Sequence, residues 1–183
     1  MRKEKKNMKS KIKISDLVLI ALFAAITAVL SQISIPMPIM VPLTLQTFAV
    51  SLCGYYLGAK KGTVSIIVYI LLGIAGVPVF AGFKGGIACI GSYTGGFIYG
   101  FIVFVFLCGL PAKNKLFKIL FGVAGLLALH FFGVLHYTLL TGNSFIVSFL
   151  SVSAPYLLKD VISVVLAYSA SLAIGKATAR VAS

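Results

Sequence analysis

Asp160 is the one acidic side chain between Leu17 and the end of the chain, and it lies within an otherwise apolar stretch. An aspartate at the centre of a membrane helix costs about 2.5 to 3.5 kcal/mol, so such residues usually face a cavity, a partner or a ligand. One interpretation is a carboxylate that accepts hydrogen bonds from the N–H groups of a ligand. The alternative is a structural ion pair with Lys159 or Lys84, or an acid that reaches the membrane interface. Because adjacent residues on a helix do not face one another, Lys159 is the less favoured partner, and we expect a ligand anchor.

Other residue types that support catalysis or metal binding are sparse. His130 and His136 are about 120° apart around a helix and have no acid or cysteine cluster nearby, so we expect hydrogen-bonded packing and no metal site. Three cysteines without CxxC spacing predict buried free thiols. The chain has no phosphate-binding G-x-x-x-x-G-K-[ST] motif and too few acids for a nucleophile–base–acid set. We therefore expect neither an enzyme nor a bound cofactor.

The composition predicts an integral membrane protein. Of 183 residues, 60% are hydrophobic, and only three acids stand against sixteen bases. A soluble domain of this length needs more ionic side chains on its surface. The runs 16–35 and 96–110 are apolar over lengths that suit a bilayer.

The element that positions Asp160 is the last of six predicted helices, and Asp160 lies one or two turns below the outer surface on it. Before it, residues 35–38 and 141–154 are predicted external connections, and residues 76–93 an irregular, glycine-rich segment. Ser15 is the predicted N-cap of the first helix. The predicted helices cover residues 16–34, 43–57, 63–74, 94–110, 116–140 and 155–175.

Charge placement predicts the topology. With six helices, fourteen of the sixteen bases fall on one side, and only Lys84 and Lys159 fall near the other. The positive-inside rule then places both termini in the cytoplasm. We expect residues 1–14 to be a basic cytoplasmic tail that contacts anionic membrane lipid rather than nucleic acid. Residues 15–183 are expected to form a single six-helix transmembrane domain, whose first apolar segment is too long for a cleaved signal peptide.

The first predicted helix carries small residues four apart, Ala21 with Ala25 and Ala24 with Ala28. Such spacing lets a second helix approach closely within lipid. The partner helix could belong to another protein or to this chain, and the spacing leaves both open.

A resemblance to a known family emerges from several ordered motifs. Residues 41–50 read Val-Pro-Leu-Thr-Leu-Gln-Thr-Phe-Ala-Val, and they are followed by glycine-containing motifs at 54–62, 73–82, 85–86 and 94–97. Together with Asp160 they resemble the BioY family, the biotin-specific substrate-binding subunits (S components) of energy-coupling-factor transporters. The resemblance spans nearly the whole chain.

The resemblance implies an all-α, six-helix S component in the plasma membrane of a prokaryotic cell, with biotin bound near the outer face. Asp160 would contact the ureido ring. Ala21 and Ala25 would dock on a transmembrane coupling subunit, and two ATP-binding cassette ATPases would supply the energy. The ureido group would bond Asp160, Ser163 and Gln46, and Lys84 or Lys159 would pair with the carboxylate. The full set that we expect at the substrate is Asp160, Ser163, Lys159, Lys84, Gln46, Thr44, Phe80, Gly82, Phe83, Tyr93 and Thr94.

Two positions depart from the family pattern. The family usually has Asp-x-x-Lys on the last helix, and here the second position is Ser163; where Gly-Pro is usual, this chain has Ser92-Tyr93. Either another lysine takes over, or affinity is reduced, or the ligand is not biotin. Two other functions also stay open: a stand-alone proton-coupled carrier with Asp160 as a titrating relay, and a membrane scaffold in which Asp160 is structural.

Overall fold

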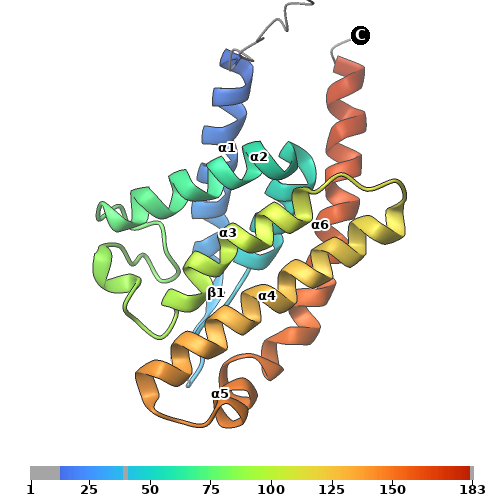
Figure 1. The fold of residues 1–183 in the computed structure, drawn as a ribbon. Helices are drawn as coiled ribbons and strands as arrows, with labels where there is room; N and C mark the ends of the chain where they lie inside the picture. Colours follow the sequence, from blue (N-terminus) through green and yellow to red (C-terminus); the bar gives the residue numbers. More distant parts are fainter. Residues whose placement is uncertain (1–12, 39–40, 182–183) are drawn as a thin grey trace, which may run out of the picture.

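The computed structural model describes residues 13–38 and 41–181, so the predicted basic tail lies outside the described residues except for its last two positions. These residues form an all-helical bundle with one two-stranded hairpin and a short 3₁₀ turn, Ile87–Cys89. Figure 1 shows that α1 begins and α6 ends at the same end of the bundle, with α5 at the opposite end. The helices are α1 (Ile14–Gln32), α2 (Gln46–Ile74), α3 (Gly95–Gly109), α4 (Lys115–Thr141), α5 (Phe145–Val152) and α6 (Ala154–Val181).

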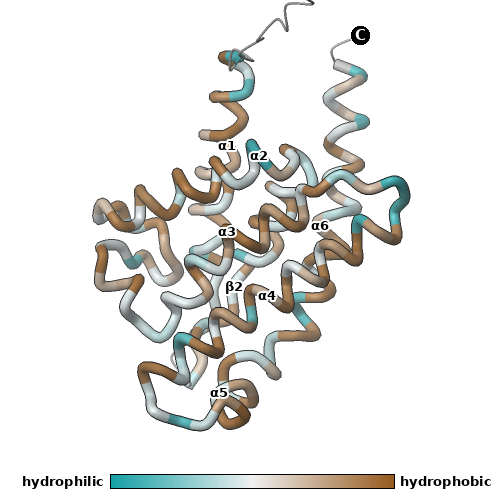
Figure 2. The backbone as a smooth tube through the Cα atoms, viewed as in Figure 1, coloured by the Kyte–Doolittle hydropathy of each residue, from teal (hydrophilic) through white to brown (hydrophobic). Residues whose placement is uncertain are grey.

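The helices have the length and surface of a membrane protein. Among the described residues, α1, α2, α4 and α6 are each long and apolar enough to cross a bilayer, and α3 is a shorter apolar helix. Hydrophobic residues follow all of these helices, while hydrophilic ones gather at helix ends and at the α3–α4 connection (Figure 2). Outward-facing apolar side chains such as Val29, Leu127 and Leu158 are more than half exposed. Such a surface suits acyl chains rather than water.

The region around α2 differs from the prediction in two ways. The two helices expected at 43–57 and 63–74 form one continuous element that bends at Gly58, whose φ of 78° and ψ of 169° are not helical. A positive φ favours glycine, which explains the residue at the bend. Leu43–Thr44 form strand β2, paired antiparallel with β1 (Ser34–Ile35), and are not the first turn of the helix. The Thr44 hydroxyl accepts the Gln46 N–H at 3.3 Å, a local bond that competes with helix formation.

The helix ends bring two more corrections. Ser15 does not cap α1, because the helix begins at Ile14 and Lys13 occupies the cap position. The segment 141–154, expected to be a loop, contains α5. Its start is capped by Ser144, which accepts the Val147 N–H, directly after Gly142 ends α4 in the left-handed conformation.

The glycine-rich connection between α2 and α3 is irregular, as predicted. Its tip is a small hairpin in which the backbone N–H groups of Phe80 and Lys84 donate to each other's carbonyls at 2.9 and 3.2 Å. The Phe80 ring is buried and lies directly over Gly73, where an added Cβ would overlap the ring. Gly73 therefore lets Phe80 turn back onto α2, where it packs edge-on against Tyr69.

Candidate binding cavity

A cavity of about 300 Å³ lies between the start of α2, the middle of α4 and the start of α6. Its walls come from residues 41–47, the hairpin and 3₁₀ turn between α2 and α3, and the facing sides of α3, α4 and α6. Small-molecule sites usually have this form, with mostly apolar walls and a few well-placed polar groups.

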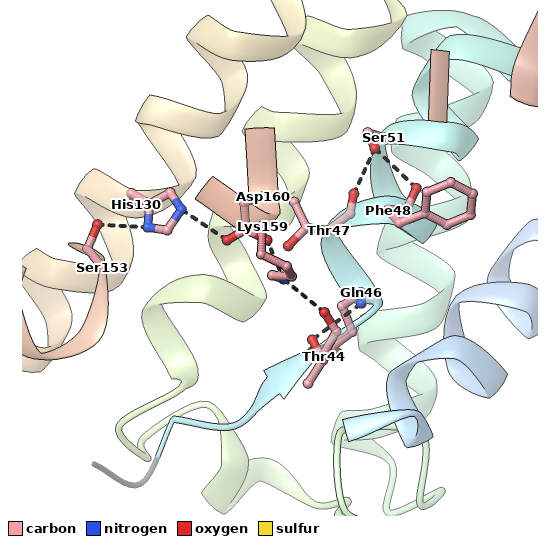
Figure 3. A network of polar contacts seen from close by, with 9 residues as sticks. All are labelled: Thr44, Gln46, Thr47, Phe48, Ser51, His130, Ser153, Lys159 and Asp160. Carbon is pink, nitrogen blue, oxygen red and sulfur yellow. Dashed lines mark hydrogen bonds and ion pairs between the residues drawn. The ribbon is translucent and has the colours of Figure 1, made fainter. Parts of the chain in front are cut away.

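The polar groups gather around Asp160, which is 4% exposed. One carboxylate oxygen forms an ion pair with Lys159, and the other, Oδ2, lies 3.2 Å from Nε2 of His130. Nδ1 of His130 is in turn 2.8 Å from the Ser153 hydroxyl. Figure 3 shows this chain of contacts, which runs from α4 to Asp160 on α6. A carboxylate offers about four lone-pair sites, so Asp160 keeps acceptor capacity for a ligand.

Lys159 pairs with Asp160, so the prediction that it is the less favoured partner is wrong. Adjacent Cβ atoms do point in different directions on a helix, but the long, flexible lysine stem lets the ammonium group turn back onto Asp160. The same ammonium also donates to the carbonyl of Thr44 at 2.9 Å. Asp160 therefore has a structural ion pair and borders a cavity at the same time.

A second set of hydrogen bonds links the segment before α2 to its surroundings. The Gln46 amide donates to the Tyr69 hydroxyl at 2.8 Å, and that hydroxyl donates to the Val79 carbonyl at 3.1 Å. From α6, the Tyr156 hydroxyl donates to the Val41 carbonyl at 2.5 Å. These bonds hold the polar side chains at the cavity in fixed positions.

Seven of the eleven predicted substrate residues line the cavity: Asp160, Lys159, Lys84, Gln46, Thr44, Phe80 and Thr94. Four do not. Ser163 is buried one turn deeper along α6, and Phe83, with a φ of 55°, is 71% exposed at the hairpin tip beside Gly82. Tyr93 packs against Tyr137, with ring centroids 5.5 Å apart, away from the cavity wall.

Sequence reasoning missed other residues of the wall, of which His130 is the most consequential. It was expected to be hydrogen-bonded packing, and it is hydrogen bonded, but to Ser153 beside Asp160. Nothing in the sequence links a histidine in the middle of one apolar helix to an acid on another. Thr47 and Tyr156 were missed for the same reason, together with the apolar wall residues Val41, Phe97, Phe101, Leu129 and Val152.

The two small-residue pairs on α1 face different ways. Ala24 is 3% exposed and packs in the core, with Ala28 beside that core. Ala21 and Ala25 are exposed on the outer face. Close packing within the chain therefore accounts for Ala24 and Ala28. The exposed pair, Ala21 and Ala25, is left available to another helix.

No cluster of three or more metal-ligating side chains occurs within residues 13–38 and 41–181. The three cysteines are free. Cys53 and Cys108 are buried as predicted, whereas the prediction is wrong for Cys89, which is partly exposed and lines the cavity.

A helical membrane bundle with a solute-sized cavity and a buried acid at its wall defines a class of small-molecule-binding membrane protein. The chain belongs to the BioY family, whose model matches residues 4–180. It is 40% identical over 158 residues to the "Probable biotin transporter BioY" of Pyrococcus horikoshii, covering 85% of this chain and 96% of that protein. It is 43% identical over 122 residues to the "Biotin transporter BioY" of Thermotoga maritima, covering 65% of this chain and 72% of that protein.

The fold also matches a solved structure, the S-component for biotin from an ECF-type ABC transporter. The TM-score is 0.83 at 24% identity, over 92% of this chain and 95% of the other. The expected S-component fold is thereby confirmed. Because the named relatives are transporters, the prediction that the chain is not an enzyme is also confirmed. Family membership and the four helices of spanning length among the described residues make it a multi-pass protein of the plasma membrane.

Proposed function

We propose that this protein captures biotin in the cavity beside Asp160, as the substrate-binding S component of an energy-coupling-factor transporter. The observation that carries the proposal is a buried carboxylate with remaining acceptor capacity at the wall of a solute-sized, mostly apolar cavity. Membership of the BioY family and the named relatives support biotin as the solute.

The cavity offers groups for each part of biotin. The ureido N–H groups would donate to Asp160, and the ureido carbonyl would accept from a donor such as Gln46 or Thr44. Phe80 and Phe97 would cover the sulfur-containing ring and the valeryl chain. Each hydrogen bond to the charged carboxylate would contribute about 1.5 to 3 kcal/mol.

For the biotin carboxylate, Lys84 is the better partner. The Lys159 ammonium is already engaged by Asp160 and by the Thr44 carbonyl. Lys84 also lines the cavity, and no ion pair joins it to a carboxylate of the described residues. An ammonium group that has no acid of its own is suited to an incoming anion.

The departure at Ser163 does not leave Asp160 without support. The resemblance implies a lysine on the same helix face, whereas here a second polar group beside Asp160 comes from α4, as His130. The acid is therefore held from two helices, which supports biotin itself as the ligand.

We propose six membrane crossings, with the Gly58 bend dividing α2 into two, and both termini in the cytoplasm.

Uptake would need partner subunits. The exposed pair Ala21 and Ala25 would dock on the transmembrane coupling subunit, and two ATP-binding cassette ATPases would drive transport.

Calorimetric titration of the purified protein with biotin tests the proposed substrate. We expect saturable binding at or below micromolar biotin. Lipoate, which has the same carboxyl chain but no ureido ring, is the matched competitor and should not displace biotin. If the wild-type protein does not bind micromolar biotin, the substrate is wrong although the fold stands.

A further inference from the structure

A second hollow, of about 430 Å³, lies where the α3–α4 connection meets the second half of α6 and the end of the first half of α2. It shares no lining residue with the cavity beside Asp160. Figure 2 shows the α3–α4 connection as the most hydrophilic stretch on this part of the bundle. The wall consists of Tyr55, Tyr56, Ala112, Lys113, Asn114, Lys115, Lys118, Tyr168, Ser171, Leu172 and Gly175.

The charge of this hollow is entirely positive. Lys113, Lys115 and Lys118 line it, and no acidic residue does. The two acids of the described residues are engaged elsewhere, Asp16 with Lys61 and Asp160 with Lys159. Three lysines therefore line the hollow without a carboxylate of residues 13–38 and 41–181 to neutralise them, which favours an external anion.

The other polar residues of the wall carry hydroxyl groups, which suit the phosphate of a lipid head group. Tyr55, Tyr56 and Tyr168 bring three phenol groups to the hollow. The Tyr55 hydroxyl donates to the Lys118 carbonyl at 3.4 Å, which ties α2 to the start of α4 and keeps the basic wall in place. The Ser171 hydroxyl is at the α6 side.

One wall residue of the hollow, Leu172, is a large apolar side chain that is 44% exposed. Leu116 and Phe117, which neighbour the lysines in the sequence of α4, do not line the hollow but are also exposed. A free phosphate ion would leave these apolar side chains uncovered. A phospholipid would cover them with its acyl chains while its phosphate meets the ammonium groups.

We infer that this hollow is a binding site for the phosphate of an anionic phospholipid. Charge-assisted hydrogen bonds from Lys113, Lys115 and Lys118 hold the phosphate oxygens, and the acyl chains lie along Leu172. Basic pockets between membrane helices on the cytoplasmic side bind such head groups in other proteins. The inference does not depend on the identity of the solute beside Asp160.

Native mass spectrometry of the full chain, equilibrated with equal phosphatidylglycerol and phosphatidylcholine, tests it. We expect the wild-type protein to retain phosphatidylglycerol preferentially. The double variant Lys113→Gln with Lys118→Gln should lose that preference by about tenfold or more, because it removes two of the three cations that would face the phosphate. The matched control, Lys13→Gln with Lys60→Gln, removes the same charge outside the hollow and should keep the preference.

The source of the phosphate is separated in a second arm. If inorganic phosphate displaces the lipid and raises the melting temperature of the wild-type protein but not of the double variant, the site binds the anion in its free form as well. Equal retention of both lipids by the wild-type protein would overturn the site, and so would an equal loss in the control. Circular dichroism and thermal melting establish that both variants fold.

Discussion

Nε2 of His130 lies 3.2 Å from Oδ2 of Asp160, so the acid at the cavity wall is held from α4 as well as from its own helix. Both side chains are almost fully buried, and the other His130 nitrogen is 2.8 Å from the Ser153 hydroxyl. Lys159 completes the arrangement from the next position of α6. A charge held from several sides is pre-organised for a ligand, which then loses less free energy to ordering the site.

Replacing Asp160 with Asn keeps the shape of the side chain and removes its charge. We expect biotin affinity to fall at least about tenfold, equivalent to about 1.4 kcal/mol, because a neutral amide is a weaker acceptor for the ureido N–H groups. Calorimetry or radiolabelled biotin measures the change. The control is Asp16→Asn, whose acid pairs with the half-exposed Lys61 and should leave affinity unchanged. Unaltered affinity in the Asp160 variant would remove that residue from the site.

Replacing His130 with Ala deprives both Ser153 and Asp160 of a buried polar partner. The expected loss is about 1 to 3 kcal/mol in the free energy of unfolding, together with weaker biotin binding. Thermal melting and titration measure the two effects. His136→Ala is a matched control on the same helix, because its ring is only partly buried and contacts the Ser92 carbonyl rather than Asp160. Equal behaviour of the two variants would contradict the positioning role of His130.

The proposal that Lys84 meets the biotin carboxylate can be tested with biotinamide, which lacks that charge. Lys84→Gln should weaken biotin binding but leave biotinamide binding unchanged. Lys159→Gln removes the contacts to Asp160 and Thr44, so it should weaken both ligands alike. Titration of both variants with both ligands gives the comparison. If the two patterns are exchanged, Lys159 is the carboxylate partner.

An added methyl group at Gly73 would overlap the Phe80 ring. Gly73→Ala should displace this ring from the cavity wall, destabilise the fold by about 1 to 3 kcal/mol through overpacking, and weaken biotin binding. Gly175→Ala is the control, because its Cβ would meet no atom within 4 Å. Melting temperatures and titrations distinguish the two. Equal affinities would show that the position of Phe80 does not matter for binding.

The outward pair on α1 is expected to act in transport and not in binding. Enlarging Ala21 and Ala25 to Leu should leave biotin affinity intact and abolish ATP-dependent uptake into vesicles that contain the coupling subunit and ATPases. Val165→Leu, at an exposed position of α6, is the control. Uptake that persists without ATP and collapses with the proton gradient would instead support a stand-alone carrier.

Much of the fold could be predicted because apolar length and glycine placement act locally. The runs that became α1, α3, α4 and α6 are each long and apolar enough to be recognised without tertiary information. The short helix α5 was missed, although Gly142 is an ordinary helix end and Ser144 an ordinary N-cap. Its eight residues follow a helix that is already long enough to span the membrane, so the segment was predicted to be a connection.

The site was less predictable because it is assembled from distant segments. Asp160 stood out, since a lone acid in an apolar run is costly. The direction of the Lys159 side chain depends on the Thr44 carbonyl, which only the folded chain brings near. Likewise, His130 became part of the site through the packing of α4 against α6, which leaves no pattern in the sequence.

Two hydrogen bonds join α6 to the segment that follows β1, one from Tyr156 to the Val41 carbonyl and one from Lys159 to the Thr44 carbonyl. The Lys159 ammonium thus contacts both Asp160 and strand β2. A solute that binds either Asp160 or Lys159 would weaken or strengthen these shared contacts. Solute binding at Asp160 would for this reason be coupled to the position of strand β2.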